Sequence, residues 1–473
     1  MIICPTSLVC NVRVNFTDDT IAAVSTPAGQ GGIGIVRMSG PGAIAIASKI
    51  FKSSPREKTV AGAKTFSLIY GHVVDGSGKV LDEAIVSVMR GPRSYTREDV
   101  VEINCHGGMV VMRKVLELMI SEGARLAEPG EFTKRAFLNG RISLAQAEAV
   151  LDLISARTEE GMRIAAEQLK GGLSERLAEI RGSLLEDCAF VEAHIDFPEE
   201  DIGTRTKGEI TGRLEKTIEE LKRICRTFDE ARFFRDGLSV AIVGRPNVGK
   251  SSLLNGLLLK DRAIVTELPG TTRDIIEEQI SVKGLPVIIV DTAGIRHSEE
   301  VVEKEGIRRS IDAMEKADFV ITVLDGSMPF QTADIEILER IKDKNALIAV
   351  NKSDLPLVIS SGKLSPFNKP CLFISATTGQ GLEELKDVVY EANLRDWRKE
   401  REGVVVTNLR HRTALEQAAS GIERAAGVIS REEPLEIFSL ELREALDRIG
   451  EITGAVTTDE ILCKIFNSFC IGK

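Results

Sequence analysis

The sequence has few aromatic residues and lacks long apolar runs. Phe, Trp and Tyr make up 4% of the 473 residues, which argues against a wide base-stacking platform for single-stranded nucleic acid. No run approaches the ~18 apolar residues that a membrane-spanning helix needs, so we expect a soluble protein without a membrane partner. The 61 Lys and Arg residues against 71 Asp and Glu residues give a formal charge of -10. Any RNA must therefore meet a local basic patch or a partner.

Cysteine and histidine are too sparse and too scattered for a metal framework. The eight cysteines form no C-x-x-C pair, and only five histidines accompany them. This distribution excludes a typical zinc or disulfide scaffold and favours a reducing, cytoplasmic compartment. Residues 1–16 lack the basic start and the cleavage pattern of a signal peptide, so we interpret them as a loose N-terminal extension.

The first 240 residues divide into a strand-rich part and a helical part. Short apolar or β-branched runs over 20–105, broken by Gly and Pro, predict strands, and residues 109–121 favour a helix. After a capping box at Ser143 and Gln146, apolar stripes over 173–195 and 210–228 predict two long helices packed together in antiparallel fashion. An α+β domain is therefore followed by helices.

The rest of the chain alternates strands with helices and then returns to helices. Five apolar strands between residues 239 and 391 alternate with helical stretches, which is typical of a doubly wound α/β domain. Apolar stripes over 415–429 and 435–449 predict two more helices. The α/β domain thus interrupts a helical domain, so the fold class is multidomain α/β and α+β. We predict the domain ranges 1–137, 138–236, 237–395 and 396–473.

One glycine-rich segment predicts a phosphate-binding loop. Residues 244–252, GRPNVGKSS, follow an apolar strand and open a helix, which is the context that this motif requires. Backbone N–H groups of the loop can surround the β-phosphate of a nucleotide. Lys250 supplies a positive charge to the β- and γ-phosphates, and Ser251 offers a hydroxyl to Mg²⁺.

Three further motifs in the right order predict that the nucleotide is GTP. Asp291–Gly294 can face Mg²⁺ and the γ-phosphate, and Asp354 can accept two hydrogen bonds from guanine, which adenine could not donate. Each motif follows a strand, where ligands of such sheets bind. The predicted contacts in these motifs are Asn247, Val248, Gly249, Lys250, Ser251, Ser252, Asp291, Thr292, Ala293, Gly294, Asn351, Lys352, Asp354, Ser375 and Ala376.

A second glycine-rich segment is a weaker candidate. Residues 29–34, GQGGIG, fit a dinucleotide-binding pattern, but a strand-like run follows where that site needs a helix. We interpret this segment as a glycine-rich turn.

Several motifs together resemble one family of GTPases. Residues 266–274, TELPGTTRD, with the phosphate loop, resemble the translation-factor-class GTPases that are activated by potassium. Within that group, the segments GGIGIVR (31–37), HGG (106–108), PGEF (129–132), RAFLNG (135–140) and CIGK (470–473) resemble the MnmE family, also called TrmE. The resemblance covers essentially everything after Thr20.

The resemblance implies a tRNA-modifying function. Members of this family act with a flavin-dependent partner, MnmG (GidA), in a hetero-oligomer. They use a one-carbon unit from a tetrahydrofolate, 5-formyl or 5,10-methylene, to form the 5-carboxymethylaminomethyl or aminomethyl group on the wobble uridine of certain tRNAs. The family also implies a homodimer through the N-terminal domain and control by nucleotide-driven approach of the two GTPase domains.

The resemblance also implies residues of a folate site. The family's folate contacts fall on Arg37, Glu102, Arg141 and Lys473, although the first two residues alone would fit an ordinary surface ion pair. Cys470 is implied in function, whereas a lone cysteine near Ile465, Phe466 and Phe469 is more often a buried apolar residue.

The hydrolysis step lacks the glutamine that small GTPases use. Ile295 follows Asp291–Gly294 where a Gln would orient water. We expect Asn247 to bind K⁺ with backbone carbonyls of Thr266, Leu268 and Thr271, and Ser251 and Thr272 to bind Mg²⁺. The family implies Glu303 as the residue that positions the attacking water, against the alternative of a solvated carboxylate. The predicted GTP contacts in this segment are Thr266, Glu267, Leu268, Pro269, Gly270, Thr271 and Thr272.

A second class of function fits the GTPase motifs alone. A GTP-switched ribosome-maturation factor would share them, but we would expect it to carry an RNA-binding module with a basic surface. The acidic helices and the CIGK segment favour the modification enzyme instead.

Overall fold

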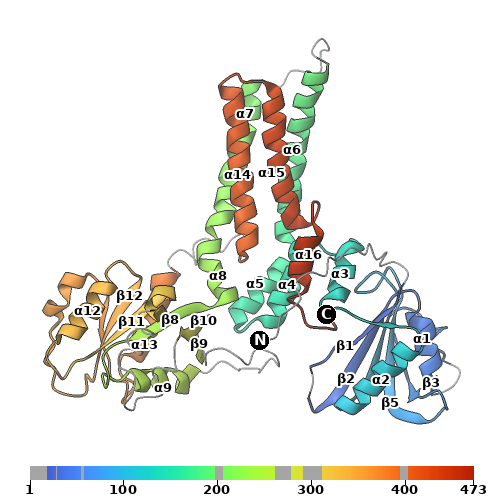
Figure 1. Cartoon of the computed structure of the whole chain (residues 1–473), viewed down its shortest axis with the longest axis horizontal. Coiled ribbons are helices and arrows are strands. Elements are labelled where there is room, and N and C mark those ends of the chain that lie inside the picture. The colour runs from blue at the N-terminus through green and yellow to red at the C-terminus, as the bar shows by residue number, and fades with distance from the viewer. Residues whose placement is uncertain are drawn as a thin grey trace, which may run out of the picture. The chain divides into compact units, whose positions relative to one another are not determined.

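The computed structural model describes two compact units (Figure 1). Unit 1 comprises Met1–Glu148 and Val456–Lys473, and unit 2 comprises Ala149–Ala455. The finer division into four ranges stays a prediction. The described residues are 19–27, 29–54, 58–197, 206–261, 278–290, 312–394 and 403–473.

Unit 1 is built on a seven-stranded sheet with the order β3-β4-β5-β6-β2-β1-β7. β7 pairs in parallel with β1, and the other neighbours are antiparallel. Apolar side chains of the sheet pack against helices α1 and α2, so the larger core lies on this face, and a smaller cluster with Ile21, Ala23 and Phe132 lies on the other face of β1. The strands are β1 (Ile21–Val24), β2 (Gly31–Ser39), β3 (Phe51–Ser53), β4 (Ser67–Val74), β5 (Val80–Met89), β6 (Val100–Gly107) and β7 (Arg125–Leu126).

One helix of unit 1 follows the sequence prediction, and two shorter helices were not predicted. α2 (Met109–Ser121) has the predicted bounds, and α1 (Ala43–Ile50) and α3 (Glu131–Leu138) are shorter. Residues 29 and 30 bend and β2 follows, which confirms the turn interpretation of the GQGGIG segment. A Cβ at Gly34 would lie 2.4 Å from the Met112 sulfur, so this glycine lets α2 approach the sheet. α16 (Asp459–Phe466) also belongs to unit 1.

Unit 2 contains four long helices that lie side by side (Figure 1). Although α6 packs mainly against α15 and α7 mainly against α14, the predicted contact between α6 and α7 is present. These two helices do touch, because Arg213 donates to the Ser183 hydroxyl at 2.8 Å. The helices are α4 (Leu144–Ser155), which begins at the predicted capping box and continues from unit 1, α5 (Glu159–Lys170), α6 (Gly172–Asp196), α7 (Lys207–Arg226), α8 (Phe228–Asp236), α14 (Leu409–Ser430) and α15 (Leu435–Thr453).

A doubly wound α/β segment is inserted between α8 and α14. Its sheet has the order β13-β12-β11-β8-β10-β9, and apolar clusters cover both faces. All neighbours are parallel except β9, which the sequence analysis missed. The elements are β8 (Leu238–Val243), α9 (Lys250–Asp261), β9 (Glu278–Val282), β10 (Leu285–Val290), β11 (Phe319–Asp325), α12 (Thr332–Arg340), β12 (Ala346–Asn351), the 3₁₀ turns η1 (Ser361–Lys363) and η2 (Ser365–Phe367), β13 (Cys371–Phe373) and α13 (Leu382–Asn393).

Candidate functional site

The predicted phosphate loop connects β8 to α9. Lys250 is the first residue of α9, and its ammonium group donates to the carbonyl oxygens of Gly244 and Arg245, both at 2.8 Å. Burial lowers the pKa of Lys250 from its ordinary value. The loop therefore holds a partly desolvated positive charge at the end of a parallel strand, which suits a polyphosphate.

A buried asparagine joins three of the predicted motifs. The Asn351 amide donates to the Val248 carbonyl at 2.9 Å, and the Ala376 N–H donates to the Asn351 side-chain oxygen at 2.9 Å. Gly249, with φ of 99°, leaves room for this side chain, because a Cβ there would lie 2.1 Å from the Asn351 nitrogen. The amide thus fixes the phosphate loop relative to the guanine-binding motifs.

Lys352 and Asp354 follow directly at the end of β12. The Lys352 ammonium group lies 2.6 Å from an oxygen of Asp325, which is the last residue of β11, and Asp354 is exposed. Burial alone would raise the pKa of Asp325, but hydrogen bonds from Lys352 and Ser327 outweigh it and lower that pKa. Asp325 was missed from the sequence, although it ends an apolar run at the sheet edge where ligands bind.

Several predicted site residues lie outside the described residues. These are residues 266–272, Asp291–Gly294 and Glu303, so the K⁺ and Mg²⁺ sites and the catalytic glutamate stay predictions. Within the described part, Arg245 is engaged in an ion pair with the buried Asp334, at 2.6 Å.

In unit 1, two of the implied folate residues form a pair across neighbouring strands. Arg37 of β2 lies opposite Glu102 of β6, and Nε of the arginine donates to Oε1 of the glutamate at 2.7 Å. Both side chains are mostly covered, and the Arg37 guanidinium lies 5.6 Å from the centre of the Phe132 ring. A half-buried charge pair next to an aromatic ring could bind a flat polar heterocycle.

The other two implied folate residues contact Tyr95 and the backbone of Phe132. Arg141 lies over the Tyr95 ring at 4.8 Å, and Tyr95 packs against the cluster that contains Phe132. The Phe132 N–H donates to the Lys473 carbonyl oxygen at 3.1 Å. All four residues are therefore linked through Phe132 and Tyr95.

Cys470 lies in the last segment of unit 1, beside the start of α3. It is exposed, so the interpretation of a buried apolar cysteine was wrong. The Gly130 N–H donates to the Cys470 carbonyl at 3.4 Å, and Ile471 pairs with Pro129. These contacts fix the backbone of residues 470 and 471, whereas the exposed Cys470 is accessible to another molecule.

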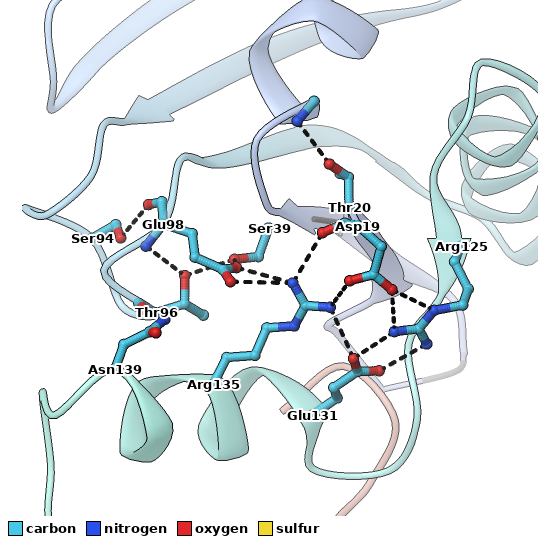
Figure 2. A network of polar contacts seen from close by, with 11 residues as sticks. Asp19, Thr20, Ser39, Ser94, Thr96, Glu98, Arg125, Glu131, Arg135 and Asn139 are labelled. Atoms are coloured by element: carbon cyan, nitrogen blue, oxygen red, sulfur yellow. Dashed lines mark hydrogen bonds and ion pairs between the residues drawn. The ribbon is translucent and has the colours of Figure 1, made fainter. Parts of the chain in front are cut away.

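A buried ionic network, which was not predicted from the sequence, connects α3 to Asp19 and Arg125 (Figure 2). Arg135 and Glu131 of α3 are each 1% exposed, and Arg135 donates to Glu131, Asp19 and Glu98. Arg125 donates to both Glu131 and Asp19. Burial alone would raise the pKa values of Glu131 and Asp19, but the hydrogen bonds from the arginines outweigh it and lower both. Glu131 and Arg135 belong to the PGEF and RAFLNG segments, and they are one helical turn apart.

Two features are absent from the described residues. In that part of the chain, no group of three or more His, Cys, Asp or Glu side chains could hold a metal ion. No described helix is both long and apolar enough to cross a membrane.

Comparisons with known proteins identify the family. The family model for the MnmE helical domain matches residues 144–470, and the model for the GTP-binding protein TrmE N-terminus matches residues 20–141. A tRNA modification GTPase MnmE from Alkaliphilus oremlandii is 45% identical over 461 residues, covering 97% of this chain and 100% of that protein. The chain belongs to the MnmE family.

A second curated relative carries the same family name, and a solved GTPase domain is similar to part of the chain. A tRNA modification GTPase MnmE from Carboxydothermus hydrogenoformans is 46% identical over 461 residues, covering 96% of this chain and 100% of that protein. The G domain of the T. maritima FeoB iron transporter is 30% identical, covering 33% of this chain and 98% of that chain with a TM-score of 0.25. The MnmE assignment spans both units and does not depend on the GTPase motifs alone.

Proposed function

We propose that this protein is a K⁺-activated GTPase that modifies tRNA with a flavin-dependent partner, MnmG. It uses a tetrahydrofolate one-carbon unit to form the 5-carboxymethylaminomethyl or aminomethyl group on the wobble uridine. The observation that carries this proposal is the family match over nearly the whole chain, together with a phosphate loop that Asn351 joins to the guanine motifs.

The two units supply different parts of the activity. In unit 2, Lys250 binds the phosphates of GTP, Ser251 with Thr272 binds Mg²⁺, and Asp354 selects guanine. Mg²⁺ neutralises charge that develops on the phosphates during cleavage. In unit 1, Arg37, Glu102, Arg141 and Lys473 bind the reduced folate, and Cys470 serves the modification. The contacts described above for Lys250, Arg37, Glu102, Arg141 and Lys473 support the roles proposed for these residues.

Analysis of wobble uridine in cells that lack the protein tests the proposal. Mass spectrometry of their tRNA should show uridine without the C5 substituent, and the wild-type gene should restore it. A Lys250→Ala gene should fail to restore it, because GTP binding is lost. Normal tRNA together with defective ribosomal subunits would instead support a ribosome-maturation factor.

Glu102→Ala is expected to weaken binding of 5-formyltetrahydrofolate. The carboxylate of Glu102 can accept hydrogen bonds from the amino-pyrimidine edge of a pterin, and a hydrogen bond to a charged group contributes about 1.5–3 kcal/mol. Isothermal titration calorimetry should therefore show a loss of about 10- to 150-fold in affinity.

Two controls separate the folate role from a simple ion pair. Glu117→Ala removes an exposed carboxylate that pairs with Lys114 on α2, and it should leave folate affinity unchanged. Glu102→Gln should fall between the wild type and Glu102→Ala, since the amide retains an acceptor. Full affinity in Glu102→Ala would rule out this acceptor.

The outward face of the unit 1 sheet is the proposed dimer surface. Leu68, Tyr70 and Ile85 are large apolar residues on this face, and Leu68 is 67% exposed. Exposed apolar groups of this kind mark interaction surfaces. We expect analytical ultracentrifugation of the full chain at micromolar concentration to show a dimer, and Leu68→Asp to shift it to monomer. Val110→Asp changes a similarly exposed apolar residue on α2, so this variant should remain dimeric. A monomeric wild-type protein would contradict the proposal.

A further inference from the structure

Residues 470–473, the C-terminal segment, lie between two walls of unit 1. One wall is the end of β1, where the Ser25 hydroxyl donates to the Gly472 carbonyl at 3.2 Å. Gly472 has φ of 97°, and a Cβ there would lie 2.2 Å from the Val24 carbonyl oxygen. The other wall is the start of α3, where Phe132 donates to the carbonyl of Lys473. A small change in the spacing of the walls would break contacts on one side.

The buried network connects α3 to the residues just before β1, so it joins the two elements that carry these walls (Figure 2). Asp19 lies two residues before β1, and it accepts a hydrogen bond from Arg135 of α3 at 2.6 Å through its carboxylate. Arg135 also donates to the Asp19 backbone carbonyl at 3.1 Å. Arg125 bridges the same two sides, at 2.7 Å from Asp19 and 2.7 Å from Glu131.

The network also fixes the turn that touches the C-terminal segment. A Glu131 carboxylate oxygen accepts a hydrogen bond from the Glu128 N–H at 2.8 Å. The residues between them, Pro129 and Gly130, are those that contact Ile471 and Cys470. Gly130 is left-handed, with φ of 65°, so this turn has a specific shape.

The composition of the network points to positioning more than to stability. Buried charges are costly to desolvate, and apolar side chains of similar volume often serve stability as well or better. Here three carboxylates and two guanidinium groups meet, and two of these residues belong to α3, whose start contacts the C-terminal segment. Ion pairs have directional bonds that apolar packing lacks, and they fix one relative placement of β1 and α3.

We propose that Asp19, Arg125, Glu131 and Arg135 are positioning residues that place the C-terminal segment, and with it Cys470, for the tRNA modification. The role of Cys470 rests on the proposed function, whereas the placement of the segment does not. We expect GTP hydrolysis to be independent of this network, because the phosphate loop belongs to unit 2.

Hydrogen–deuterium exchange of the full-length protein tests the placement. Arg125→Ala is the first variant, because Arg125 is partly exposed and its loss is tolerated better than that of the buried Arg135. We expect the peptide covering residues 467–473 to exchange at least 10-fold faster than in the wild type. Arg125→Lys keeps one charged donor and should restore part of the protection. Unchanged exchange in a folded Arg125→Ala protein overturns the proposal.

Two controls separate positioning from general loss of stability. Val115→Ala opens the core on the other face of the sheet and destabilises unit 1 without touching the network. At a matched loss of thermal stability, it should leave exchange of the 467–473 peptide unchanged. Glu117→Gln removes an exposed carboxylate and should change nothing. Equal acceleration in Val115→Ala and Arg125→Ala would show that the network only stabilises the unit, and the proposal would then be wrong.

The functional part has its own readout. In Arg125→Ala, wobble uridine modification should fall at least 10-fold, while GTP turnover stays within a factor of two of the wild type. Faster exchange with normal modification would overturn the assigned role of Cys470 but not the placement of the segment.

Discussion

Replacing Asn247 should remove the acceleration of GTP hydrolysis by K⁺ and leave GTP binding intact. Asn247 is exposed in the phosphate loop, so its side-chain oxygen can bind a cation, whereas Lys250 still binds the phosphates. A charge near the β–γ bridge is worth a large factor in rate, since an arginine finger contributes ~10³–10⁵. We expect wild-type turnover to be at least ~10-fold faster in KCl than in NaCl at matched ionic strength.

The choice of substitution matters at this position. Asn247 has φ of 64°, a conformation that alanine adopts at a cost of roughly 1–2 kcal/mol and glycine adopts freely. Asn247→Gly therefore removes the side-chain oxygen without straining the loop. Asn247→Ala should lose the K⁺ response to the same extent, but the strain should also lower the stability of the folded protein. We also expect K⁺ to promote contact between the two GTPase domains, and Glu303→Ala should keep this contact and hydrolyse GTP poorly.

Equal wild-type rates in the two salts would mean that a protein arginine supplies the charge. Arg245 is held by the buried Asp334, so Arg296 would be the first candidate to replace.

Cys470→Ser is expected to abolish wobble uridine modification and to leave GTP turnover near normal. The thiol is exposed in unit 1, whereas the phosphate loop lies in unit 2. Serine preserves size and hydrogen bonding but is a far weaker nucleophile and acid at neutral pH. Mass spectrometry of tRNA and a phosphate-release assay on the same protein measure the two activities.

A second exposed cysteine provides the matched control. Cys463 lies on α16 in the same unit, and Cys463→Ser should retain both activities. Full modification by Cys470→Ser would show that this thiol has no chemical role.

Local patterns in the sequence were sufficient for much of the fold. The bounds of α2 and the strand–loop–helix context of the phosphate loop depend on neighbours in sequence, and both were predicted correctly. The strand β9 was missed, although the glycine at 284 between two apolar runs is a sequence signal for a hairpin turn. Lys283 and Gly284, with φ of 51° and 85°, form a two-residue turn with positive φ values, which is typical of a hairpin.

Long-range partners could not be predicted from the same patterns. An apolar stripe shows which face of α6 is buried, but not that α15, more than 200 residues later, covers it. The buried network was missed for a related reason. Charged residues such as Glu131 and Arg135 are mostly exposed in proteins, and only their spacing of four residues hinted at a pair. Their partners Asp19 and Arg125 come from other elements.

Unit 1 is built from both ends of the chain, and this delays its completion during synthesis. α16 and the C-terminal segment belong to unit 1 but follow residues 149–455 in the chain. At 5–20 residues per second, a ribosome needs on the order of 15–60 s to make that intervening stretch. Residues 470–473 can take their place between β1 and α3 only after this delay, when the end of the chain leaves the ribosome. A chain that stops early can therefore form an intact phosphate loop yet lack Cys470, and we expect such a fragment to hydrolyse GTP without modifying tRNA.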